Sequence, residues 1–313
     1  MSDSGTVMTV LGPVAGTDLG FTLPHEHIYC TLRHADYRYD VADQFVDEDV
    51  MADEITAFAD LGGTAIFDLS VPDNGRSPRR LRTLSERTGV HLVMGCGWYR
   101  GNYYLPEERI DRRSTDDLAE ELIGEITNGV GDTGIRPGVI GEIGSEKDWV
   151  SPAEERVLRA VARAHKATGL AIGALHAIGP VAPQQLTILE EEGADLSRVA
   201  VAHCDAYPHL RYLLGLLERG VYIMFDNCGQ FRGMGQFEGR ILDLIRELLD
   251  RGFEDRMMLS HDVCKLGQLR IHGGTGFVYL SETFLPALSA KGVPDRTIST
   301  LTLDNPRRWL TGV

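Results

Sequence analysis

Apolar and polar residues alternate along this chain in a repeating two-part pattern. Short runs rich in valine, isoleucine and leucine recur, and each is followed by a longer segment whose apolar residues return at helical spacing. The pattern predicts eight strands, at residues 21–23, 64–69, 92–96, 139–143, 171–175, 199–202, 222–225 and 257–260. Most positions within each run are apolar, which is typical of strands that are covered on both faces.

Helix signals fill the spaces between these strands. Helices are predicted at residues 49–61, 116–127 and 153–168, among others. The last of them follows a capping serine, Ser151, with Pro152 at its first position, and Gly169 closes it. Because strand and helix alternate throughout without a long linker, we predict a (β/α)₈ TIM barrel of the α/β class, as one domain over residues 1–313. An open doubly wound sheet is the structural alternative.

Composition limits the class of protein and its partners. Of the 313 residues, 43% are hydrophobic and 25% charged, as in a globular protein with a large core. The 46 acidic residues outnumber the 31 basic ones, so a net charge of −15 would repel a nucleic-acid backbone. No segment approaches the roughly 20 consecutive apolar residues of a membrane helix, and the N-terminus lacks a signal-peptide pattern. We therefore expect a cytoplasmic protein without nucleic-acid or membrane partners, and its five scattered cysteines favour reduced thiols.

Histidines and carboxylates stand at the C-terminal ends of the predicted strands. His25 and His27 follow the first strand, where residues i and i+2 share one face, so both can bind one metal ion. Taken alone, such a pair is equally well explained as two hydrogen-bonded polar residues. Further donors end later strands, namely Glu142, His176, His203 and Asp262. In a barrel all these strand ends converge on the mouth that carries the active site.

The joint presence of six donors at one mouth favours a metal site. Without metal ions, six crowded and unpaired polar groups would destabilise the fold by several kcal/mol, so packing does not explain them. Four imidazoles and two carboxylates suit zinc better than magnesium or calcium, which prefer oxygen ligands. Six ligands also exceed the three that one catalytic zinc takes, so we predict two divalent metal ions, most simply Zn²⁺, with a bridging carboxylate.

The same residues lie in motifs that resemble the phosphotriesterase family of the amidohydrolase superfamily. The motifs occur in the family's order over nearly the whole chain: Leu23-Pro24-His25-Glu26-His27, Gly95-Cys96-Gly97-Trp98-Tyr99, Gly141-Glu142-Ile143-Gly144, Val201-Ala202-His203-Cys204-Asp205, Leu259-Ser260-His261-Asp262 and Asn305-Pro306-Arg307-Arg308-Trp309-Leu310. The resemblance implies a binuclear metal-dependent hydrolase. In it, a hydroxide that bridges the metals attacks an ester, a lactone or a similar small carbonyl substrate, with phosphotriesters as a side reaction.

The resemblance also assigns a role to each donor. It implies that His25, His27 and Asp262 hold the more buried metal, that His176 and His203 hold the more exposed one, and that Glu142 bridges them. Asp262 would also carry the proton to the leaving group, as general base and acid. Its neighbour His261 would point to the opposite face of the strand, away from the metals.

Two departures from the family's pattern concern the bridge and the pocket wall. Glu142 stands where many phosphotriesterases and lactonases have a carboxylated lysine, and this favours the branch of the phosphotriesterase homology proteins. Leu175 and Ala177 flank His176, where relatives usually have threonines. The histidine itself is kept, so the metal prediction stands while the neighbouring pocket wall differs.

Two residues are predicted to contact substrate. Tyr99 matches a tyrosine that lines the pocket of lactonase-like relatives, although an aromatic residue is also commonly a packing residue. Arg232, in the loop after the seventh strand, has the planar fork that orients an anionic substrate, and its alternative is a solvated loop arginine. The long irregular stretch at residues 98–113 follows the third strand, where barrel enzymes place substrate contacts.

Several functions remain open at the level of sequence. The prediction is a hydrolase of a small-molecule ester or lactone, and an N-acyl amide hydrolase with the same site is the alternative. From another class, a metal-stabilised barrel that only binds a small ligand is a rival, although the proton-transferring Asp262 argues against it. A metal-dependent lyase or isomerase is a third possibility. The resemblance further implies a homodimer.

Overall fold

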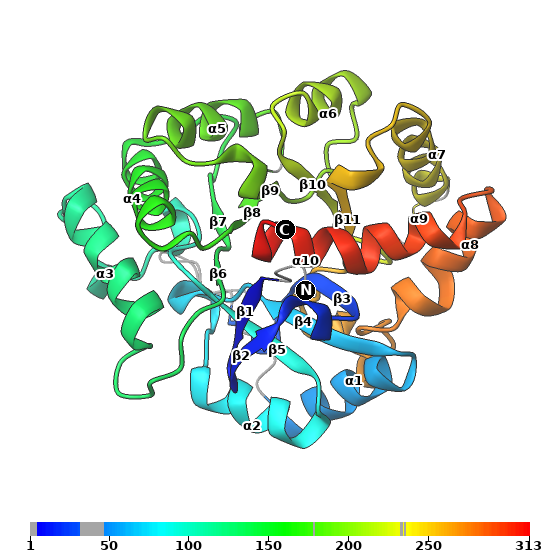
Figure 1. Cartoon of the computed structure of the whole chain (residues 1–313), viewed down its shortest axis with the longest axis horizontal. Helices are drawn as coiled ribbons and strands as arrows, with labels where there is room; N and C mark the ends of the chain where they lie inside the picture. The colour runs from blue at the N-terminus through cyan, green and yellow to red at the C-terminus, as the bar shows by residue number, and fades with distance from the viewer. Residues whose placement is uncertain (1–4, 32–46, 178, 232–233, 235) are drawn as a thin grey trace.

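Parallel strands surround the centre of the computed structural model, which describes residues 5–31, 47–177, 179–231, 234 and 236–313 (Figure 1). The strands of the central sheet are β3 (Phe21–Glu26), β4 (Gly63–Asp68), β5 (His91–Cys96), β6 (Val139–Ile140), β7 (Ile143–Gly144), β8 (Ile172–His176), β9 (Val199–Val201), β10 (Tyr222–Phe225) and β11 (Met257–Leu259). They pair in the order β3-β4-β5-β6-β8-β9-β10-β11, with β7 also beside β8. All eight predicted strands are therefore found, with ends that differ by a few residues.

The two ends of this strand order meet, so the sheet is a nearly closed barrel. Beyond β11, the backbone N–H of Asp262 donates to the carbonyl of His25 at 3.2 Å. The backbone N–H of His25 in turn donates to the Ser260 hydroxyl at 3.1 Å. The predicted (β/α)₈ barrel is confirmed, and the open doubly wound sheet is wrong because β3 and β11 lie side by side.

Helices follow the strands in sequence and cover the outside of the barrel (Figure 1). They are α1 (Glu48–Asp60), α2 (Pro78–Thr88), α3 (Thr115–Asn128), α4 (Pro152–Thr168), α5 (Ala182–Glu191), α6 (Leu210–Leu217), α7 (Phe237–Asp250), α8 (Leu285–Ala290), α9 (Asp295–Ser299) and α10 (Asn305–Thr311). The caps predicted for α4 are confirmed, since Ser151 accepts a hydrogen bond from the Glu154 N–H and Gly169 has φ +72°. Among the described residues, none of these helices is long and apolar enough to span a membrane.

The strand predicted over residues 139–143 is not continuous. Gly141 and Glu142 interrupt it between β6 and β7, and they are joined by a cis peptide bond. The Glu142 N–H donates to the carbonyl of Leu69, the residue that follows β4, at 2.8 Å. A Cβ atom at Gly141 would lie 2.1 Å from the carbonyl oxygen of Gly173, so only glycine fits there. This irregular backbone brings the Glu142 side chain to the barrel axis.

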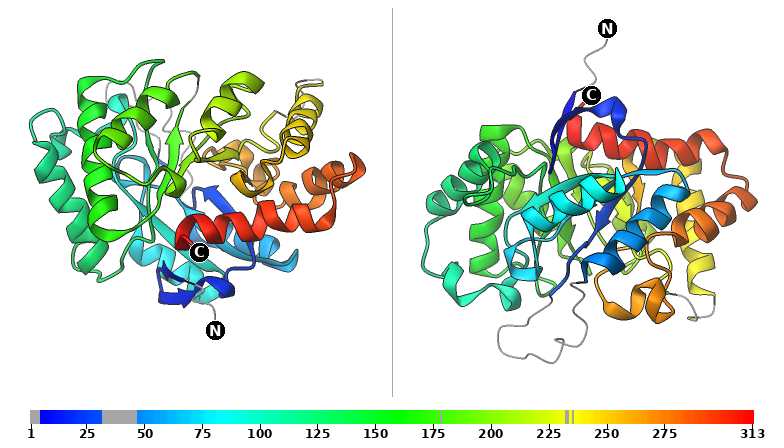
Figure 2. Two further views of the ribbon diagram at one scale, coloured as in Figure 1. Left: turned by 45° about the horizontal axis from the view of Figure 1, so that its top comes forward. Right: turned by 90° about the horizontal axis from the view of Figure 1, so that it is seen from below.

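The base of the barrel is closed by the two terminal segments. The hairpin of β1 (Thr6–Thr9) and β2 (Gly12–Ala15) lies beside α10 at the same end of the molecule (Figure 2). From α10, the fully buried Trp309 enters the barrel floor, where its indole N–H lies 3.2 Å from the carbonyl oxygens of both Ile172 and Arg198. Apolar side chains from the strands complete this floor. The opposite end of the barrel is therefore the mouth.

Candidate metal centre

The six predicted donors meet at the mouth of the barrel. His25 lies in β3, His176 ends β8, and the others follow strand ends: His27 after β3, Glu142 after β6, His203 after β9 and Asp262 after β11. All six are buried, and the most exposed of them, Asp262, is 8% accessible. Convergence of strand ends thus gathers residues that are as much as 237 positions apart (25 to 262).

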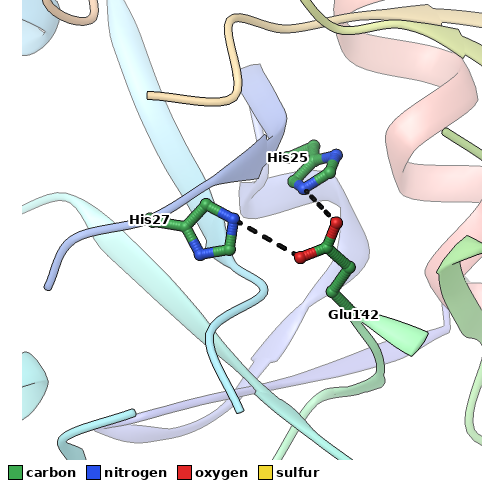
Figure 3. A group of neighbouring side chains, drawn as sticks. All are labelled: His25, His27 and Glu142. Atoms are coloured by element: carbon green, nitrogen blue, oxygen red, sulfur yellow. Dashed lines mark ion pairs between the residues drawn. The ribbon is translucent and has the colours of Figure 1, made fainter. Parts of the chain in front are cut away.

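The Glu142 carboxylate faces two histidines of the β3 segment, His25 and His27 (Figure 3). Its two oxygens are 3.8 Å from Nε2 of His25 and 3.7 Å from Nε2 of His27. The oxygen that faces His25 also lies 3.4 Å from Nε2 of His203. Glu142 is therefore the one carboxylate of the six donors that contacts both the β3 histidines and the β9 histidine.

Asp262 faces the β3 histidines from the other side. One carboxylate oxygen lies 3.2 Å from Nε2 of His27 and 3.6 Å from Nε2 of His25. Its backbone has φ +51°, a conformation that residues other than glycine rarely adopt, and the amide of Gln230 donates to its carbonyl at 2.9 Å. The unusual backbone is thus held by a specific partner.

His261 points away from this centre, as the sequence argument expected. Its Nδ1 lies 2.8 Å from the buried carboxylate of Glu26, and its Nε2 accepts the backbone N–H of Leu280 at 2.9 Å. Glu26 also accepts the backbone N–H groups of His261 and Val263, both at 2.9 Å. Glu26 therefore fixes the segment that presents Asp262.

His176 and His203 form the second half of the cluster. Their rings pack edge to face with centroids 4.5 Å apart, and Tyr99 packs against His176 at 5.2 Å. Nδ1 of His176 is buried without a hydrogen-bond partner among the described residues. His203 has φ +56°, a second unusual backbone conformation at the site. Tyr99 thus lies beside one of the six donors, as a substrate contact would, and its contact with substrate stays a prediction.

Asp226, which follows β10, holds two of these histidines by their Nδ1 atoms. One of its oxygens lies 2.7 Å from Nδ1 of His25, and the other lies 3.1 Å from Nδ1 of His203. A carboxylate only accepts, so both imidazoles carry a proton on Nδ1, and Nε2 is the nitrogen that is left for a metal ion or a second proton. These are the nitrogens that face Glu142. The sequence argument missed Asp226, although it stands at a strand end like the predicted donors.

Ser70 and Asp68 hold His27 in the same way. The Ser70 hydroxyl donates to Asp68 at 2.6 Å, and it therefore accepts the Nδ1 proton of His27 at 2.9 Å. Nε2 of His27 then presents its lone pair to Asp262 and Glu142. Fixing a ligand imidazole through its second nitrogen is the usual arrangement around metal ions.

The carboxylates of the cluster favour a positive charge on the histidines beside them. Burial opposes protonation, but the carboxylates of Asp262 and Asp226 outweigh it and raise the pKa of His25 to about 9. Burial likewise opposes protonation of His203, yet Asp226 and Glu142 raise its pKa well above the usual value. The carboxylates therefore favour a positive charge between themselves and Nε2, which either a proton or a metal ion can supply.

The donor set fits divalent metal ions. Nε2 of His25 is fully buried and has no hydrogen-bond partner among the described residues, as has Nδ1 of His176. Two groups of donors have ligand atoms within 4.8 Å of one another and share Glu142, namely His25, His27 and Glu142, and Glu142, His176 and His203. A third such group, His25, His203 and Asp226, is explained by the Nδ1 contacts described above. The orphaned nitrogens are those that a metal ion would satisfy.

A cavity of about 270 Å³ lies between the loops that follow β10 and β11, and none of the six donors lines it. Its lining includes Gln230, His261, Val263 and Lys265. Arg232, the second predicted substrate contact, lies outside the described residues.

Comparison with known proteins agrees with this geometry. A model of the phosphotriesterase family matches residues 5–310. The phosphotriesterase homology protein of Escherichia coli is 31% identical, over 93% of this chain and 97% of that protein. The N-acetyltaurine hydrolase of Rattus norvegicus is 29% identical, over 98% of both chains. The crystal structure of a lactonase from Listeria monocytogenes superposes with a TM-score of 0.91 at 27% identity, over 98% of this chain and 99% of that one.

Proposed function

The chain belongs to the phosphotriesterase family, and on that premise we propose that it hydrolyses a small ester or lactone at a pair of divalent metal ions in its barrel mouth. The observation that carries the proposal is the position of Glu142 between the two groups of histidines. A carboxylate shared by two groups of ligands is what a binuclear centre needs. The lactonase with the same fold supports the substrate class.

The proposed ligands divide into two groups around Glu142. His25, His27 and Asp262 would hold one ion, and His176 and His203 the other. Divalent ions bound there would activate a water molecule near neutral pH and polarise the carbonyl oxygen of the substrate. We propose Zn²⁺ for both positions because four imidazoles and two carboxylates match its preferences.

Asp262 is the proposed general base and acid. Its side chain is 12% exposed, against 2% for Glu142, so it faces the substrate side of the cluster while Glu142 lies beneath. Gln230 donates a hydrogen bond to the Asp262 carbonyl, and Glu26 accepts the N–H of the next residue, Val263. These hydrogen bonds hold the Asp262 carboxylate in place. It would take a proton from the attacking water and return it to the leaving group.

A second candidate is the hydrolysis of an N-acyl amide. It is favoured by the N-acetyltaurine hydrolase relative, which matches this chain over its whole length. The same attack on a carbonyl carbon serves esters and amides, so the pocket decides between them. The predicted homodimer and cytoplasmic location stay predictions.

Metal content per chain tests the bridge. Elemental analysis of purified wild type is expected to give about two ions per chain, and Glu142→Ala is expected to retain far less because both groups of ligands lose a shared donor. Glu146→Ala is the matched control, since Glu146 follows β7, close to Glu142 in the chain, but pairs with Arg100. About one ion, unchanged in Glu142→Ala, would show that Glu142 is not a bridge.

Turnover in ¹⁸O-labelled water tests the reaction class. A hydrolase places one solvent oxygen in the acid product from an ester, a lactone or an N-acyl amide. Product without solvent oxygen would instead mean a lyase or an isomerase. No turnover of any of these substrates by the metal-loaded wild type would leave a barrel that only binds its ligand.

A further inference from the structure

Arg100 contacts Tyr99, whose ring packs against a proposed metal ligand, His176. Its guanidinium carbon lies 4.9 Å from the ring centroids of both Tyr99 and Tyr103. Tyr99 in turn packs edge to face against His176, with the centroids 5.2 Å apart. The Arg100 side chain is 18% exposed, so the cation sits in the wall of the mouth and not on the open surface.

Part of the hydrogen-bonding capacity of this guanidinium is not used. An arginine offers five N–H donors in a planar fork, yet the buried Nε of Arg100 has no hydrogen-bond partner among the described residues. Its Nε and the Glu146 oxygen 3.3 Å from it are both buried, but their geometry does not meet that of a hydrogen bond. A shielded cation with free donors is unfavourable unless an acceptor reaches it.

The backbone around Arg100 is held firmly. The N–H of Tyr99 donates to Asp73 at 2.9 Å, and the carbonyl of Tyr99 accepts the N–H of Gly144 at 2.7 Å. On the other side of Arg100, the N–H of Gly101 donates to the buried Glu154, which also accepts the N–H of Glu146. The loops after β5 and β7 are thus tied together on both sides of Arg100. Its position is preorganised, as expected of a residue that binds a ligand.

We propose that Arg100 binds an oxyanion of the substrate, a carboxylate or a sulfonate, so that the substrate is anionic; for the N-acyl amide candidate above, this means an N-acyl amino acid or N-acyl aminosulfonate. This inference rests on the hydrolysis proposed above and selects among its substrates. The planar fork of arginine matches the geometry of such an anion. A neutral lactone would leave the fork unsatisfied.

The reaction with such a substrate is an ordinary hydrolysis. The oxygen of water bonds to the acyl carbon, the carbon–nitrogen bond breaks, and the proton taken up by Asp262 passes to the departing nitrogen. The products are a carboxylic acid and an amine that keeps the oxyanion. Arg100 would hold that oxyanion through the reaction and so fix the acyl group at the cluster.

Glu146 modulates this binding in the opposite direction. It neutralises part of the Arg100 charge in the free protein, and a substrate oxyanion would compete with it for the same guanidinium. Replacing Glu146 with glutamine is therefore expected to strengthen the binding of anionic substrates. Substitutions of Arg100 and of Glu146 should thus change the affinity for anionic substrates in opposite directions.

A matched pair of substrates tests the proposal on metal-loaded protein. N-acetyl-β-alanine and its primary amide share the scissile bond and differ by one charge, and N-acetyltaurine supplies the sulfonate. Wild type is expected to prefer the anions in kcat/KM. In Arg100→Met this preference should fall about tenfold or more, mainly through KM, which is the usual effect of losing a hydrogen bond to a charged group. Glu146→Gln should raise the preference, and Arg100→Lys should fall between wild type and Arg100→Met.

Arg113→Met is the control, because Arg113 lies in the same loop but pairs with Glu121 and should leave the preference as it is. Equal losses for the anion and the amide in Arg100→Met would overturn the proposal. If wild type turned over neutral esters but preferred the neutral amide, this inference would fail while the proposed function stood. If nothing were turned over, the proposed function would fail, and calorimetric binding of the same compounds to wild type and Arg100→Met would still decide the role of Arg100.

Discussion

The base and the mouth of this barrel are buried to a similar degree but are built from different side chains. At the base, Trp309 lies in a cluster that includes Val139, Ala171, Met224 and Met258, and its one polar atom has carbonyl partners. At the mouth, four imidazoles and several carboxylates are enclosed within a few ångströms of one another. The first arrangement stabilises the fold by removing apolar surface from water.

The second arrangement stabilises the fold much less on its own. Removing charged groups from water is unfavourable unless each is paired, and the nitrogens that point to the centre lack such partners. The strained backbone at His203 and Asp262 destabilises the mouth further. The base therefore stabilises the fold, and the mouth carries reactive groups that do not. Substitutions at the base should lower stability, and substitutions at the mouth should lower activity.

The largest effect is expected from Asp262→Asn at the mouth. An amide cannot take up and return the proton, and it is a weaker ligand, so kcat should fall by about 10³-fold or more. Thermal unfolding of the metal-free protein should change little, because a buried negative charge is removed. Asp255→Asn serves as the control, because Asp255 lies at the base, where it pairs with Arg308 of α10. A kcat within tenfold of wild type would show that Asp262 does not transfer the proton.

Trp309→Ala at the base should have the opposite profile. Removing a fully buried indole from a packed floor is expected to lower the free energy of unfolding by about 3 kcal/mol or more, measured by urea denaturation. The activity of the protein that remains folded should stay near that of wild type. Trp149→Ala is the control, because Trp149 is 47% exposed and should change stability little. Loss of kcat without loss of stability would mean that the two ends are not separable.

Most of the barrel and the six donors could be predicted from the sequence, for a physical reason. Short buried strands leave a continuous apolar pattern, and a donor at the C-terminal end of a strand has to point into the mouth. The same rule would have found Asp68, which ends β4, and Asp226, which follows β10. They were missed because they do not contact the centre themselves but act through the histidines.

Other features depend on contacts that no local pattern encodes. The break at Gly141 depends on the carbonyl of Gly173 in a neighbouring strand. The position of Arg100 over Tyr99 and Tyr103 depends on Glu154, about fifty residues away. Such tertiary contacts override the regular strand and loop geometry that sequence periodicity suggests.

Asp226→Asn gives the smallest effect but tests the mouth most directly. Both oxygens of Asp226 accept imidazole Nδ1 protons, from His25 and from His203. Asparagine keeps one acceptor, so one of the two histidines would face an N–H₂ donor and move its own proton to Nε2. That nitrogen would then be blocked as a ligand, and metal affinity should fall about 10- to 100-fold in a competition titration with a chelator.

Asp205→Asn is the matched control for this titration. Asp205 is a buried carboxylate of the same network, but it accepts hydrogen bonds from the backbone and side chain of Asn227. Burial raises the pKa of Asp205 to about 7, so the titration is made at about pH 8 or above, where this substitution removes a negative charge while Asp226 stays the carboxylate partner of both imidazoles. If both variants lost metal affinity equally, the negative charge of the network, and not the fixed tautomers, would set the affinity. If only Asp226→Asn lost metal affinity, the affinity would depend on keeping the Nδ1 protons of two imidazoles in place. A residue that itself binds no metal would then determine how tightly the mouth binds its ions.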